Sequence, residues 1–176
     1  ISLMKIWVKK GYRVPVFLIA LWWCVTPVCA QVLNPEMGAA VDAADALFKA
    51  MKDGDYPAVW TYLTEKTRRE IVESVSGRAK KMGLTLDAVA LMEDFAGGGP
   101  YAKAYWDAFL ERFNPDMVLV ESTWTPGELK GDRATILIRH RKAEKPAVLE
   151  MRKESGQWRV GLDETFGHIQ RYILRQ

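Results

Sequence analysis

Residues 50–64 read AMKDGDYPAVWTYLT, and this stretch indicates how the chain begins to fold. An apolar helical pattern over residues 36–52 ends at Gly54, because glycine readily adopts the left-handed conformation that terminates helices. Asp55 is a favoured N-cap, and Pro57 follows early, where a missing N–H costs little. Val59, Trp60 and Leu63 continue the apolar face. The stretch therefore predicts two helices joined by a tight elbow.

The residues before this pattern resemble a secretory leader. Lys5, Lys9, Lys10 and Arg13 form a basic region, and Val14–Val28 is an uncharged, mostly apolar run. Val28-Cys29-Ala30 fits a small-residue cleavage site. We expect residues 1–30 to be a signal peptide, with Met4 as the natural start, cleavage after Ala30 and a periplasmic or secreted product.

The alternative to cleavage is that the leader is retained as a membrane anchor. The apolar run has about 15 residues, whereas a spanning helix needs ~20. Cleavage would leave residues 31–176 as a single domain with no stable membrane span.

Cysteine and charge narrow the class of protein. The only cysteines, Cys24 and Cys29, lie in the leader, so the mature chain would have no disulfide and no cysteine nucleophile or metal ligand. Four of the 25 Lys and Arg residues also lie there, which leaves 21 against 22 Asp and Glu. A near-neutral domain gives no electrostatic reason to expect nucleic-acid binding.

The rest of the chain changes from helical to strand periodicity. Helical patterns cover residues 65–82, 86–96 and 101–113. From Met117 the apolar period becomes two, in the segments MVLVESTW, RATILIRHR, PAVLEMRK and QWRVGLD. Pro126-Gly127 and Ser155-Gly156 are expected turns. The prediction is an α+β fold: N-terminal helices packed on a curved antiparallel sheet of about four strands.

Three segments together resemble a known superfamily. They are ALFKAMKDGDY, PAVWTYLT and GDRATILIRHR…LEMRKESGQWRVGLDE, within residues 38–164. They are similar to the nuclear transport factor two-like superfamily, in particular to small secreted bacterial members of lumazine-binding-like or uncharacterised type. The resemblance implies a cone, in which bent helices close one end of the curved sheet. Its members include isomerases, dehydratases, ligand carriers and structural subunits, so the fold alone does not choose a function.

Two residues are candidates for catalysis. Enzymes of this superfamily carry an acid, alone or with His or Arg, inside the cone, and His140 could point there from the end of an apolar strand face. Glu121 could be a buried carboxylate or could pair with an arginine at the sheet surface. No metal site is expected, because the chain has two histidines and no convincing ligand set. If the tail is helical, Glu164 and His168 would share one face of it, which indicates an ion pair or a frayed end and not half of a metal site.

Aromatic side chains indicate a binding site more clearly than the catalytic candidates do. Trp60 and Trp158 could face each other across the cone and line an apolar cavity, or they could fill it as core. The residues expected to line such a pocket are Trp60, Tyr101, Tyr105, Trp124, His140, Met151 and Trp158.

The leading hypothesis is an exported accessory domain of the cell envelope, without cofactor, that binds a small apolar molecule or a protein partner and is not catalytic. One alternative is a cofactor-free isomerase, dehydratase or hydrolase that uses a buried carboxylate with His140. Another is a structural subunit that docks, or forms a homodimer, through its sheet face. An enclosed cavity with an acidic side chain inside would favour catalysis, and an enclosed apolar cavity would favour a carrier. A filled interior together with an exposed apolar patch on the sheet would favour assembly.

Overall fold

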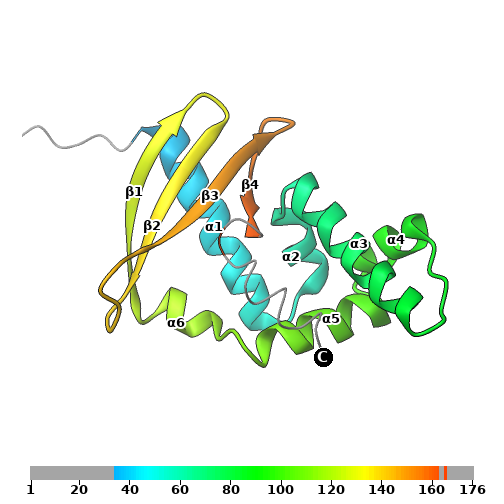
Figure 1. Cartoon of the computed structure of the whole chain (residues 1–176). Coiled ribbons are helices and arrows are strands. Elements are labelled where there is room, and N and C mark those ends of the chain that lie inside the picture. Colours follow the sequence, from blue (N-terminus) through cyan, green and yellow to red (C-terminus); the bar gives the residue numbers. More distant parts are fainter. Residues whose placement is uncertain (1–33, 163–164, 166–176) are drawn as a thin grey trace, which may run out of the picture. The chain divides into compact units, whose positions relative to one another are not determined.

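The computed structural model describes residues 34–162 and Thr165. The chain divides into units of residues 1–32 and 33–176, and the description concerns the second. Its described part is an α+β fold of six helices and a four-stranded antiparallel sheet, as predicted (Figure 1). The elements are α1 (Pro35–Asp53), α2 (Tyr56–Tyr62), α3 (Glu65–Lys81), α4 (Ala88–Gly97), α5 (Pro100–Leu110), α6 (Pro115–Leu119), β1 (Ser122–Lys130), β2 (Arg133–His140), β3 (Ala147–Glu154) and β4 (Gln157–Gly161).

The predicted elbow between α1 and α2 is confirmed. Gly54 has φ 71°, and its N–H donates to the carbonyls of Ala50 and Met51, which closes α1. The Asp55 side chain then accepts a hydrogen bond of 3.1 Å from the N–H of Ala58. The chain therefore stops one helix and caps the next within two residues.

The sheet has the strand order β1-β2-β3-β4, and α1 runs along its inner face (Figure 1). Strand alternation turns every second side chain inward, so Ile136, Leu149 and Val160 are fully buried. From α1, Phe48 and Met51 are fully buried in the same core. Complete burial of such a side chain is worth roughly 1.5–3 kcal/mol, so this layer holds helix and sheet together.

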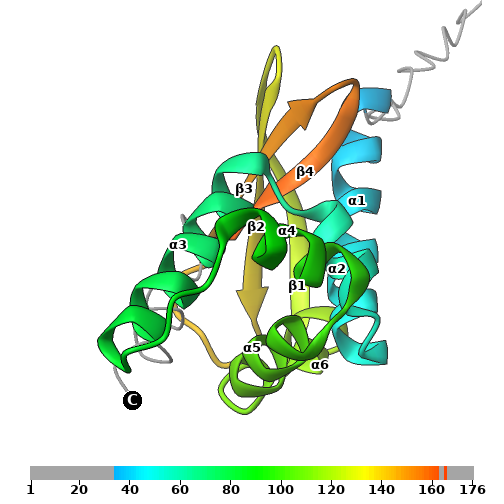
Figure 2. The ribbon, with the colours of Figure 1, turned by 90° about the vertical axis from the view of Figure 1, so that its right-hand side faces the viewer.

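Helices α2, α4 and α5 lie side by side (Figure 2). Aromatic rings fill the space among them. Trp60 lies 4.8 Å from Phe95 between ring centroids, and Phe95 lies 5.6 Å from Tyr105. Trp106 continues the series at 5.0 Å from Tyr105 and 5.6 Å from Phe109. These separations are typical of stabilising aromatic pairs. Side chains therefore occupy this part of the core.

The sequence interpretation was wrong for the segment before the sheet. Met117–Val120 was expected to open a strand, but α6 covers Pro115–Leu119 and β1 begins at Ser122. Asn114 caps α6 by accepting a hydrogen bond from the N–H of Asp116 at 2.9 Å. Helix capping, with proline in the first turn, outweighed the short alternating pattern.

The first turn of the sheet was also misplaced. Pro126 and Gly127 lie within β1, where the pairing with β2 shifts register between Pro126 and Leu129. The reversal falls instead between Lys130 and Arg133, next to Gly131 at φ 58°. A proline is tolerated here because β1 is an edge strand with a bulge.

Two smaller expectations differ from the structure. Met82, expected on the apolar stripe of α3, is the residue that follows the helix and is 69% exposed. The last long helix ends at Leu110 and not at Phe113. Within the described residues, no helix combines the length and apolarity needed to cross a membrane. Glu164 and His168 lie outside the described residues.

Candidate functional site

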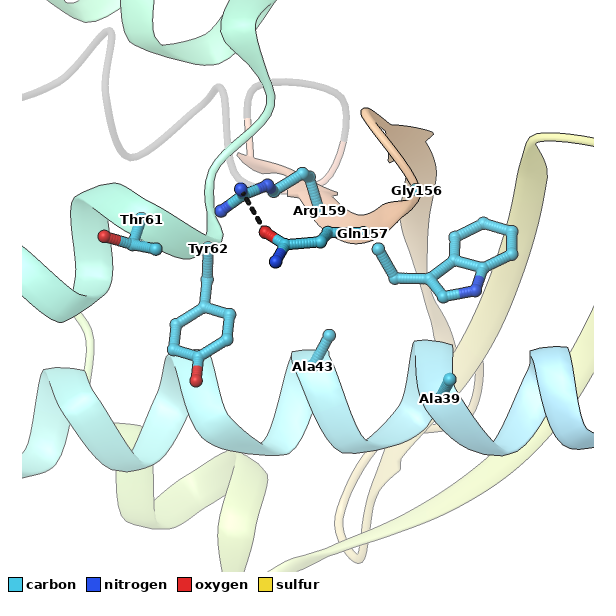
Figure 3. A pocket seen from close by; sticks show the side chains of 8 residues that line it. Ala39, Ala43, Thr61, Tyr62, Gly156, Gln157 and Arg159 are labelled. Carbon is cyan, nitrogen blue, oxygen red and sulfur yellow. Dashed lines mark hydrogen bonds between the residues drawn. The ribbon is translucent and has the colours of Figure 1, made fainter.

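A groove of about 340 Å³ lies between α1, the end of α2 and the hairpin of β3 and β4 (Figure 3). This volume is at the lower end of the range for small-molecule pockets. The groove is lined by Ala39, Ala43, Thr61, Tyr62, Gly156, Gln157, Trp158 and Arg159.

Small side chains on α1 make room for the groove. Ala39 and Ala43 lie four residues apart, so they occupy one face of the helix, and Figure 3 shows both on the side of α1 toward β4. Tyr62 stands beside them at the end of α2. Larger side chains at the two alanines would fill part of this space.

Strand β4 is an edge of the sheet, and it borders the groove. The carbonyl of Val160 accepts a hydrogen bond of 3.0 Å from the N–H of Thr64, and the N–H of Leu162 donates to Oγ1 of Thr67 at 3.2 Å. Backbone groups of alternate strand residues point to the same side. The N–H and C=O of Trp158 therefore also point away from β3, toward this edge.

Two guanidinium groups lie near each other here, because Arg159 lines the groove and Arg68 on α3 interacts with it. Arg159 donates a hydrogen bond of 2.6 Å to the side-chain oxygen of Gln157. Arg68 donates to the carbonyls of Trp60 and Thr61, both at 2.9 Å, and so caps the end of α2. Burial lowers the pKa of Arg68, and the positive charge of Arg159 lowers it further. The carboxylates of Glu154 and Glu65 act in the opposite direction on this pKa.

The two catalytic candidates meet, but away from the groove. Nε2 of His140 lies 3.1 Å from a carboxylate oxygen of Glu121, and the guanidinium of Arg141 lies 2.9 Å from the same oxygen. The N–H of Lys142 donates to Nδ1 of His140 at 3.2 Å, which makes Nε2 the donor to Glu121 in the neutral ring. The hydrogen bond from His140, with the positive charge of Arg141, lowers the pKa of Glu121.

The expected pocket residues lie in several different places. Of these residues, Trp158 lines the groove. Trp60, Tyr105 and Met151 are buried in the core, whereas Tyr101 is 44% exposed. Trp124 packs edge-on against Phe48 at 5.8 Å and donates from its indole N–H to the carbonyl of Val118 at 2.8 Å.

Sequence reasoning did not anticipate most of the groove. Ala39 and Ala43 are ordinary helix-forming residues, and Gln157 and Arg159 alternate with the apolar residues of the last strand. The signal that could have located it is the pair of small residues four apart on α1, together with a short edge strand after Ser155-Gly156.

Among residues 34–162, no three His, Cys, Asp or Glu side chains are grouped as a metal site would require. Comparisons with protein-family models, with curated proteins and with solved structures found no match. The groove and its chemistry are therefore the basis for assigning a function.

Proposed function

We propose that this chain is a non-catalytic accessory domain of the bacterial cell envelope that binds an extended segment of a protein partner in the groove beside β4. The proposal rests on the backbone of Trp158, whose N–H and C=O are directed by strand alternation to the free side of β4, beside the groove that Ala39 and Ala43 also line. An extended peptide can pair with such an edge and place side chains on the apolar floor.

A peptide suits this site better than a small apolar molecule does. Phe48, Trp106 and Phe109 are fully buried and occupy the interior in which an enclosed ligand would lie. The groove is open and has polar groups along one side, from Thr61, Gln157 and Arg159. Backbone hydrogen bonds provide affinity for a peptide that an apolar molecule cannot obtain there.

The arrangement of His140 also favours a non-catalytic role. Its two ring nitrogens are engaged, Nδ1 by the N–H of Lys142 and Nε2 by Glu121. A general base needs a nitrogen that can take a proton from a substrate. The lowered pKa of Glu121 makes this carboxylate a weaker base, as expected for an ion pair.

Export is a separate part of the proposal and has its own test. Replacing Lys9 and Lys10 with Gln, and interrupting the Val14–Val28 run with charged residues, should abolish the appearance of the protein outside the cytoplasm. Fractionation followed by immunoblotting measures this. The matched control removes Lys80 and Lys81 from α3, and it should leave export unchanged. Export of the leader variant at the normal level would contradict the proposed location.

Peptide binding can be tested by selection from a displayed library of random peptides, followed by calorimetry on the selected sequences. Ala43→Trp fills the groove and should weaken binding at least tenfold. Ala104→Trp, on the exposed surface of α5, is the control and should bind normally. Equal binding by both variants would refute the groove as the site. Native mass spectrometry of the purified protein tests the competing carrier hypothesis, which a retained small molecule would support.

A further inference from the structure

Four cationic residues lie in one row across the outer face of the sheet. The strand register pairs Lys130 with Arg133, Arg133 with Arg152, and Arg152 with Arg159. Along its strand, each of these four residues is next to a residue that faces inward. Strand alternation therefore turns all four side chains outward. We call these four residues the cationic row, and it crosses every strand of the sheet.

The two central members of the row have no carboxylate partner among the described residues. Lys130 has an ion pair with Glu128 at 2.5 Å, and Arg159 donates to Gln157, but no ion pair involves Arg133 or Arg152. Like charges placed directly opposite each other on neighbouring strands are destabilising. The sheet therefore carries a repulsion that a bound anion would relieve.

The positive charge is concentrated on the sheet. Residues 122–161 contain nine Lys and Arg against five Asp and Glu, whereas residues 34–121 contain ten against fifteen. The net charge is therefore close to zero only because a positive region and a negative region cancel. An acidic partner would be attracted to the sheet and repelled by the helices.

The row is narrow, which limits what it can bind. Glu150 and Glu154 lie two residues to either side of Arg152 on β3, so they share its face. A flat anionic bilayer or a nucleic-acid duplex would meet these carboxylates together with the row. The next row on one side contains Thr135, Glu150 and Gly161, with no aromatic ring on which single-stranded bases could stack. A thin chain that lies along the row avoids both problems.

We propose that the cationic row binds an acidic segment of a protein in extended conformation. Strands are spaced about 4.8 Å apart, so the row spans roughly 14 Å. Alternate side chains of an extended peptide repeat every ~6.6–6.8 Å, so three acidic residues at every second position match its length. Guanidinium groups can bind carboxylates through two parallel hydrogen bonds. This site shares Arg159 with the groove but does not require the groove to be occupied.

The test is fluorescence anisotropy of a labelled peptide in which Glu and Ser alternate, measured with the full exported protein at low salt. The double variant Arg133→Gln and Arg152→Gln should weaken binding roughly three- to tenfold, in line with exposed ion pairs. Lys142→Gln with Lys145→Gln removes the same charge from the loop between β2 and β3 and is the matched control. Glu150→Gln should strengthen binding about twofold, because it removes a repulsive neighbour.

Further measurements separate this site from the groove and from other anions. Ala43→Trp should leave binding of the acidic peptide unchanged, and a peptide with Gln in place of Glu should not bind. Equal affinities for the row variant and the loop variant would overturn the proposal. So would tighter, row-dependent binding to phosphatidylglycerol vesicles or to oligothymidylate than to the acidic peptide.

Discussion

Gly98, at the junction of α4 and α5, should tolerate a methyl group much less well than Gly83 or Gly77 does. Its φ is 67°, and a Cβ atom added there would lie 2.9 Å from both Cγ and Cδ of Pro57 on α2. Gly83 has a similar φ of 79° but open space around the same position. Gly77 lies within α3 and also has open space. The three glycines therefore separate backbone strain from steric overlap.

The expected free energies of unfolding follow from these geometries. Gly83→Ala should destabilise by about 1–2 kcal/mol, the cost of a left-handed conformation for an alanine. Gly98→Ala should lower the free energy of unfolding by that amount and by about 1–3 kcal/mol more, because the ring of Pro57 is stiff and α2 must shift. Gly77→Ala should stabilise by roughly 0.5–1 kcal/mol, since alanine favours a helix interior.

Urea unfolding followed by tryptophan fluorescence measures all three variants on one scale. In a domain of about 150 residues, each 1 kcal/mol should shift Tm by roughly 2–4 °C. The reasoning fails if Gly98→Ala is no less stable than Gly83→Ala, because α2 would then not be fixed against the junction of α4 and α5.

Three further predictions concern charge. Burial, with a hydrogen bond to Asp107, raises the pKa of Tyr56 to about 12. The free energy of unfolding should therefore fall as pH rises from about 10 through this value. In alkaline unfolding experiments, Tyr56→Phe should lose less stability over this range than wild type does. The pKa of Glu121 is lowered, so this carboxylate stabilises the fold at pH values above its ordinary pKa near 4.3. On acidification below about pH 5, wild type should therefore lose more stability than Glu121→Gln, as measured by thermal unfolding. The double variant Arg133→Gln and Arg152→Gln removes repulsion from the cationic row, so it should raise Tm at low salt. The increase in Tm should be smaller at high salt, because salt screens the repulsion. A lower Tm would show that the row stabilises the sheet.

Helix ends were predictable because they depend on nearby residues. Gly54 and Asp55 define the elbow, and Thr64, just before the helical pattern of residues 65–82, caps α3 by accepting a hydrogen bond of 3.2 Å from the N–H of Thr67. The two last β-strands were predictable for a similar reason. Their apolar alternation is bounded by the tight turn at Ser155 and Gly156, which have φ of 49° and 79°.

The predictions that were wrong concern segments in which two local sequence signals compete. Residues 117–120 alternate like a strand, but they follow Asn114 and Pro115, which start a helix. Pro126-Gly127 resembles a turn by composition, yet β1 accommodates it at a bulge. Neither choice can be made from apolar spacing alone, since the cap at Asn114 decides the first and the pairing with β2 decides the second.

The groove lay beyond such reasoning for a different reason. It exists because two alanines of α1 face the edge of β4, and nothing local specifies which face of α1 meets which strand. The Trp60 and Trp158 pairing expected across the cone illustrates the same problem. Trp60 lies over Phe95, whereas Trp158 donates from its indole N–H to Glu36 at 3.1 Å.

Both margins of the sheet limit uncontrolled strand addition. The chain between α2 and α3 pairs with β4 through the bridge between Leu63 and Val160, so little beyond Trp158 is accessible on that side. On the other side, Pro126 interrupts β1 with a bulge. Both features disfavour long intermolecular sheets, since natural β proteins use covered edges and bulges with proline to resist aggregation.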